Sequence, residues 1–190
     1  MKVVIIGIGL IGGSFALDIK RIFDGAQVFG KDQSEAHLKK AVELGLIDAL
    51  AHENDLLTAD IVLVSVPVHA TASLLPGILD IIGNNTLVMD VGSTKSQICQ
   101  SVSQHPKRSQ FLAMHPIAGT EFSGPEAAIS GLFEGKTNII CEFEKTAFKL
   151  QEKALNLLSK LRMRIRYMDP IAHDKHSAYV SHLSPMSSFM

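Results

Sequence analysis

Two polar residues follow apolar runs of the length of a buried strand. Ser93 comes shortly after the run at residues 86–90, and His115 comes directly after the run at residues 110–114. In a doubly wound parallel sheet, ligands bind beyond the carboxyl ends of the strands, so we expect both side chains to face one cleft. A histidine there can exchange a proton near neutral pH. The pair predicts a chemical role on the ligand side of the sheet, with a buried core histidine as the alternative.

A glycine-rich segment near the start of the chain predicts a dinucleotide site. A β-branched apolar run at residues 3–6 is followed by glycines in G-x-G-x-x-G spacing and then by a helical pattern. These glycines would allow the tight turn, the approach of a pyrophosphate and close packing of helix on strand. The helix N-terminus would attract the phosphates. The cofactor-binding residues expected here are Gly7, Gly9, Leu10, Ile11 and Gly12.

An acidic residue after the second expected strand, residues 27–30, completes this pattern. Asp32 would accept both ribose hydroxyls of an adenosine and repel a 2′-phosphate, which favours NAD over NADP. Lys31, beside it, could tolerate that phosphate. A signal peptide is the alternative for the first residues, but the spaced glycines and the absence of a cleavage site argue against it.

A third apolar run, residues 61–64, is typical of a central parallel strand. It ends at Ser65, Val66 and Pro67, and a proline stops ladder pairing. We expect these three residues to line the cofactor cleft together with Ser93.

The alternation of strand and helix patterns predicts an α/β chain with a Rossmann-type, doubly wound, mostly parallel sheet over residues 1–168. Residues 169–190 are expected to be the initial helix of a truncated helical dimerisation domain, with Pro170 in its first turn. Two local predictions are a short strand at residues 46–48 and a capping box at 94–97 with Thr94 as the N-cap.

The composition excludes several classes of protein. The 18 basic and 19 acidic residues are balanced, so no nucleic-acid partner is expected. No apolar stretch has the length of a membrane span. Cys99 and Cys141 lack metal-ligand spacing, which favours reduced thiols in a cytoplasmic protein with no metal site.

The sequence resembles the prephenate/arogenate dehydrogenase family of tyrosine biosynthesis. The matching motifs are G-I-G-L-I-G-G at 7–13, D-V-G-S-T-K at 90–95, H-P-I-A-G-T-E-F-S-G at 115–124, H-D at 173–174 and Y-V-S-H-L at 179–183. The resemblance implies NAD(P)-dependent oxidative decarboxylation of prephenate to 4-hydroxyphenylpyruvate, or of arogenate to tyrosine. It also implies a homodimer formed through a helical second domain.

The resemblance assigns roles to five residues. His115 matches the catalytic histidine, and Ser93 matches a serine that hydrogen-bonds both the substrate and that histidine. Thr120, Ser181 and His182 fall at substrate-binding positions of the family. A neutral imidazole suits the reaction, because it can accept the hydroxyl proton as hydride leaves.

Two departures from the family pattern stand out. The family typically has H-x-x-H where this chain has His182 followed by Leu183, Ser184 and Pro185. The family's helical domain also supplies an arginine for the substrate carboxylate, and neither Arg164 nor Arg166 matches it.

Two alternatives stay open at this stage. Another Rossmann dehydrogenase, of the β-hydroxyacid or ketopantoate type, would not account for the loop at 115–121. An inactive NAD-binding fragment is favoured by Pro185 and the early end of the chain and opposed by the intact Ser93 and His115. The choice between prephenate and arogenate is also open.

Overall fold

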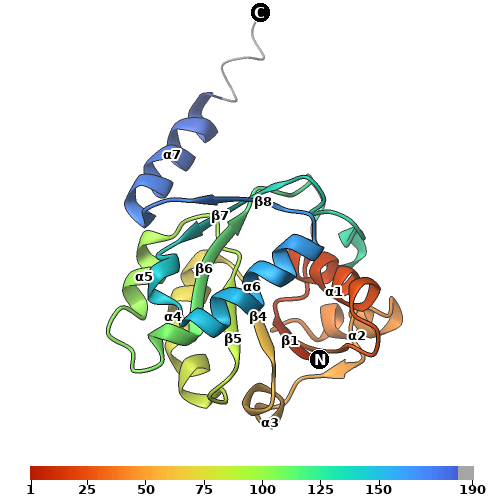
Figure 1. The fold of residues 1–190 in the computed structure, drawn as a ribbon. Helices are drawn as coiled ribbons and strands as arrows, with labels where there is room; N and C mark the ends of the chain where they lie inside the picture. Colours follow the sequence, from red (N-terminus) through yellow and green to blue (C-terminus); the bar gives the residue numbers. More distant parts are fainter. Residues whose placement is uncertain (184–190) are drawn as a thin grey trace, which may run out of the picture.

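The computed structural model describes residues 1–183, with side chains placed as far as Tyr179. Its centre is a sheet in the order β3-β2-β1-β4-β5-β6-β7-β8, in which every neighbouring pair is parallel except β6 and β7 (Figure 1). The strands are β1 Lys2–Ile6, β2 Gln27–Lys31, β3 Ala49–Leu50, β4 Ile61–Val64, β5 Leu87–Asp90, β6 Phe111–Pro116, β7 Thr137–Cys141 and β8 Arg164–Tyr167. The expectation of a doubly wound, mostly parallel sheet is confirmed.

Helices cover both faces of this sheet. They are α1 Leu10–Ile22, α2 Glu35–Glu43, α3 Glu53–Leu57, α4 Val68–Ile81, α5 Ser96–Ser101, α6 Phe148–Lys160 and α7 Pro170–Leu183. Residues of α1 and α6 belong to one hydrophobic cluster, and residues of α4 and α5 belong to the other. The sheet is therefore the middle of three layers.

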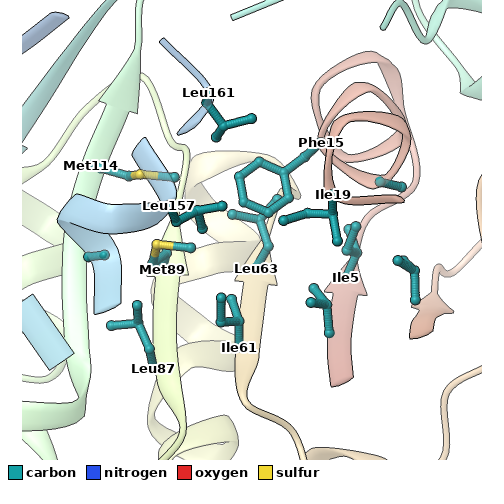
Figure 2. Close-up of a cluster of buried hydrophobic side chains, with 14 of the residues drawn as sticks. Ile5, Phe15, Ile19, Ile61, Leu63, Leu87, Met89, Met114, Leu157 and Leu161 are labelled. Atoms are coloured by element: carbon teal, nitrogen blue, oxygen red, sulfur yellow. The ribbon is translucent and has the colours of Figure 1, made fainter. Parts of the chain in front are cut away.

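The central strands are apolar throughout because both of their faces are buried. In β1, Val3 and Ile5 enter the cluster beneath α1 and α6, whereas Val4 and Ile6 enter the opposite one. Figure 2 shows the first cluster, where Phe15 of α1 lies above the strand residues. Complete burial of one such side chain contributes roughly 1.5–3 kcal/mol to stability.

The order of the strands reverses between β1 and β4, which is where such folds bind ligands. At this point the turn after β1 touches the end of β4. Gly7 has a φ of +93°, and a Cβ atom on it would lie 2.3 Å from the carbonyl oxygen of Ser65. A Cβ on Gly12 would lie 2.1 Å from the carbonyl oxygen of Gly7. These two positions require glycine because backbone meets backbone there.

The last described helix, α7, begins beside α5 and extends away from the sheet (Figure 1). Asp169 precedes it and accepts hydrogen bonds from the N–H groups of Ile171 (2.9 Å) and Ala172 (3.0 Å), which satisfies two free donors at the helix start. Ile171 and Tyr179 are exposed. Within residues 1–183, no helix is both long and apolar enough to cross a membrane.

Candidate active site

A cleft of about 290 Å³ opens at the carboxyl ends of β4, β5 and β6, beside the start of α1. Six residues expected from the sequence line it: Ile11, Ser65, Val66, Pro67, Ser93 and His115. Val68, Val91, Gly92, Pro116 and Ala118 complete the lining. The cleft therefore joins the start of α1 to Ser93, which follows β5, and to His115, which lies near the end of β6.

The glycine loop leaves the start of α1 open to an anion. Gly9 occupies the N-cap position and supplies no side-chain cap, and the first turn carries no acidic residue. The first N–H groups of a helix have no partner within the helix. A Cβ on Gly9 would meet nothing within 4 Å, so the outer surface of the loop is bare backbone. These features fit a dinucleotide pyrophosphate at Gly9, Leu10 and Ile11.

Asp32 is fixed beside this loop at the end of β2. Its two carboxylate oxygens accept hydrogen bonds from the N–H groups of Ile8 (2.8 Å) and Ser34 (2.9 Å). Each carboxylate oxygen has a further lone pair, so the group retains capacity for ribose hydroxyls. The side chain of Asp32 is 10 % exposed, whereas Lys31 is exposed.

His115 lies in β6 and contacts a second histidine from α7. Its Nδ1 is 2.9 Å from Nε2 of His173, and the two rings meet edge to face. Burial, together with the nearby His173 and the positive charge of Lys95, lowers the pKa of His115 to about 4. The imidazole is therefore neutral at pH 7 and able to accept a proton.

Asp174 connects this histidine pair to the loop that carries Ser93. It lies 2.8 Å from Nδ1 of His173 and accepts hydrogen bonds from the backbone N–H groups of Lys95 (2.7 Å) and Ser96 (2.9 Å). Burial alone would raise the pKa of Asp174, but hydrogen bonds from Ser96, His173 and the backbone lower it to about 2. Asp174 is therefore ionised at pH 7.

This contact corrects the expectation that Thr94 caps α5. The helix begins at Ser96, Lys95 stands at its N-cap, and the acceptor for its first donors comes from Asp174 in α7. A distant carboxylate replaces the local hydroxyl because it accepts two N–H groups at once. In the sequence, Asp174 could be found only as the second residue of the H-D motif at 173–174, and that motif alone does not indicate a capping role.

Beneath the site lies a buried ion pair that sequence reasoning also missed. Nζ of Lys95 bonds the carboxylate of Asp90 and the carbonyl oxygen of Met114 (2.7 Å), and both charged side chains are fully buried. The ammonium thus joins the ends of β5 and β6 immediately before His115. A buried charge needs such partners because water cannot solvate it.

Of the substrate-binding residues that the resemblance implies, only Thr120 has a described side chain, and it does not line the cleft. Thr120 is in an exposed loop, where its hydroxyl accepts a hydrogen bond from the N–H of Phe122 (3.2 Å). Ser181 and His182 fall in the last turn of α7, beyond the described side chains. Pro185 lies outside the described residues altogether.

The remaining sequence candidates serve no cleft either. Arg164 and Arg166 are exposed on the edge strand β8. Among the described residues, no cluster of three or more histidine, cysteine or acidic side chains could hold a metal ion.

A family model described as "Prephenate dehydrogenase, nucleotide-binding domain" matches residues 15–167. The chain belongs to this family. It is 35 % identical over 184 residues to the prephenate dehydrogenase of Bacillus subtilis, covering 95 % of this chain and 50 % of that protein. The resemblance inferred from the motifs is thereby confirmed.

Two solved structures of the family superpose closely on this chain. The arogenate dehydrogenase of Synechocystis gives a TM-score of 0.86 at 30 % identity, covering 96 % of this chain and 65 % of that one. The prephenate dehydrogenase of Aquifex aeolicus, in complex with hydroxyphenyl propionate and NAD+, gives 0.83 at 30 % identity, covering 92 % and 62 %. The chain thus spans about half the length of the Bacillus relative and less than two thirds of these structures.

Proposed function

We propose that this chain binds NAD and carries the catalytic histidine for the oxidative decarboxylation of prephenate or arogenate. The observation that supports this most is the place of His115, a neutral imidazole at the cleft that Ser93 and the start of α1 also line. The family membership supports the same reaction, since its relatives include prephenate and arogenate dehydrogenases.

The cofactor is proposed to be NAD, with the pyrophosphate at Gly9, Leu10 and Ile11 and the adenosine ribose at Asp32. A buried carboxylate would repel the 2′-phosphate of NADP, and its fixed position beside Ile8 supports this role. The Aquifex relative was solved with NAD+ bound. NADP is the less favoured cofactor.

The proposed mechanism divides the reaction between the cofactor and the side chains of the cleft. When bound, NAD+ supplies the hydride acceptor for the ring carbon that bears the hydroxyl. His115 accepts the hydroxyl proton, so that the oxygen becomes a carbonyl as the C–H bond breaks. Ser93 holds the same hydroxyl toward the imidazole. As CO2 leaves, the electrons of the broken C–C bond enter the ring, which becomes aromatic, and the carbonyl oxygen takes back the proton from His115 to become the phenolic hydroxyl.

Formation of NADH or NADPH tests the proposal when the purified chain is given prephenate or arogenate with each cofactor. We expect turnover with NAD, and we expect His115→Asn to abolish it while the affinity for NAD is unchanged. Lost NAD binding in that variant would show that His115 is structural. The matched control is His176→Asn, because His176 is an exposed histidine of α7 that does not line the cleft.

An NAD-binding chain without its own catalysis is the second candidate, supported by the open start of α1 at Gly9, which depends on neither Ser93 nor His115. Thermal unfolding separates the two. A ligand at one hundred times its dissociation constant stabilises a protein by about 2.7 kcal/mol. Stabilisation by NAD alone would indicate the binding module, whereas stabilisation by prephenate or arogenate as well would indicate a substrate site.

We further propose that residues 169–190 begin a second, helical domain through which two copies of the protein associate, and that the protein is cytoplasmic. The exposed Ile171 and Tyr179 on α7 support an apolar partner for this helix. Sedimentation of the chain at several concentrations tests the association, with Tyr179→Lys as the variant expected to weaken it.

A further inference from the structure

We propose that His173 and Asp174 are positioning residues, which hold His115 in the tautomer that has a proton on Nδ1 and a bare Nε2. The catalytic use of that tautomer rests on the proposed function. The tautomer itself is a property of the chain and can be measured without substrate.

The argument starts at the carboxylate of Asp174, which acts only as an acceptor. Its Oδ1 accepts the N–H of Lys95 and its Oδ2 accepts the N–H of Ser96. A carboxylate that accepts two backbone donors stays ionised. Nδ1 of His173 lies 2.8 Å from Oδ1, so this nitrogen must carry the hydrogen of that bond.

The second step follows from the two nitrogens of a neutral imidazole, of which one donates and the other accepts. With its hydrogen on Nδ1, His173 presents only a lone pair at Nε2. That lone pair is 2.9 Å from Nδ1 of His115, which must therefore be the donor. His115 is left with an unprotonated Nε2, the form that a base for the substrate hydroxyl requires.

The surroundings of the pair prevent an easy change of this arrangement. The side chain of His173 is fully buried, and the start of α7 is fixed by the bonds from Asp174 to the beginning of α5. The charged groups that act on His115 are Lys95, on the side of β5, and Asp174, on the side of α7. The ammonium opposes an added proton and the carboxylate favours one.

An added proton would disable the base wherever it settled. If it stays on His115, both nitrogens of that ring carry hydrogen. If it moves to His173, the bond between the rings reverses, and the single hydrogen of His115 is on Nε2. In either arrangement the free lone pair at Nε2 of His115 is lost.

The decisive measurement is ¹⁵N NMR of the full chain labelled at histidine, near pH 7. We expect protonated Nδ1 and bare Nε2 at His115, identified by the loss of its signals in His115→Asn. A hydrogen on Nε2 at this pH would overturn the proposal. The result depends on neither substrate nor turnover, so it stands even if the proposed reaction fails.

Two substitutions of His173 separate positioning from packing. His173→Gln retains an acceptor for Nδ1 of His115 and a donor for Asp174, whereas His173→Phe fills the space with neither. We expect the Gln variant to keep the Nδ1–H tautomer and the Phe variant to lose it.

With turnover as the readout, we expect kcat to fall about 100-fold in the Phe variant, within the range for general base catalysis. The Gln variant should recover at least a tenth of the original kcat, with NAD affinity unchanged in both. Equal kcat in the two variants would assign His173 a packing role and refute the proposal. An unaltered chain without turnover, with the expected tautomer, would refute only the proposed function.

Discussion

Alanine substitutions at Gly9 and Gly12 should have different effects: the first should weaken NAD binding, and the second should lower the stability of the fold. Gly9→Ala adds a methyl group where nothing lies within 4 Å, in a backbone with φ −88°. Gly12→Ala adds one 2.1 Å from the carbonyl oxygen of Gly7, where backbone must move. The two substitutions are chemically identical and three residues apart, so each is the control for the other.

We expect Gly12→Ala to lower Tm more than Gly9→Ala does, and Gly9→Ala to be the variant that weakens NAD binding. Forced overpacking costs about 1–3 kcal/mol, and the backbone contact at Gly12 places this substitution at the upper end. At roughly 2–4 °C per kcal/mol for a chain of this size, Gly12→Ala should lower Tm by about 6–12 °C. Alanine is the poorer N-cap by up to about 1 kcal/mol, so Gly9→Ala should lower Tm by less than about 4 °C. Its methyl group would instead keep a pyrophosphate away.

Calorimetry measures both effects, with thermal scans for Tm and NAD titrations for affinity. We expect Gly9→Ala to weaken NAD at least tenfold, equivalent to about 1.4 kcal/mol. Undiminished NAD affinity in Gly9→Ala would refute the placement of the pyrophosphate. A normal Tm in Gly12→Ala would refute the argument from backbone contact.

Three further predictions concern buried groups. Lys95→Met should lower the free energy of unfolding by about 3–5 kcal/mol, because it leaves the buried Asp90 without its ion-pair partner. The second change Asp90→Leu should restore much of that loss. Urea unfolding measures both variants, and equal stability of the single and the double variant would contradict the prediction. The pKa of His115 is about 4 in the folded chain and 6.5 in the unfolded chain. Its contribution to stability is therefore complete above pH 6.5 and is lost as the pH falls toward 4. Over this interval the urea midpoint of the native chain should fall more steeply than that of His115→Gln, and parallel falls would contradict the lowered pKa. Burial raises the pKa of Cys99 and Cys141 to about 12, so iodoacetamide at pH 8 should label neither thiol until the protein unfolds; mass spectrometry showing rapid native labelling would refute this.

The sheet was predictable from the sequence because each central strand is a continuous apolar run that can be recognised on its own. The apolar runs of β1 and β4 are buried on both faces, and burial on both faces is what such runs require. The short strand β3 was misplaced: residues 46–48 were expected, and Ala49–Leu50 pair instead. Leu46 and Ile47 are apolar because they pack into the core from a turn, while the carboxylate of Asp48 accepts the N–H of Val28 (2.7 Å).

The candidate site was predictable only in part, for a related reason. Ser93 follows β5 and His115 lies near the end of β6, so the topology alone brings them to one edge of the sheet. His173 reaches His115 across 58 positions, and Asp174 reaches Lys95 across 79. No short-range pattern encodes such contacts. The local cap expected at Thr94 was wrong for this reason, because α7 supplies the acceptor instead.

The attachment of α7 to the start of α5 has a consequence for how this chain can change over time. The close contacts of Gly7 and Gly12 come from residues no later than Val66, whereas His115 bonds a residue of α7, which begins at Pro170. The two capabilities are thus inherited through separate sets of residues. Under the proposed function, a lineage that loses the contact of Asp174 would lose the base and keep the nucleotide site, and a lineage that alters the glycines would keep the base and lose the bound hydride acceptor.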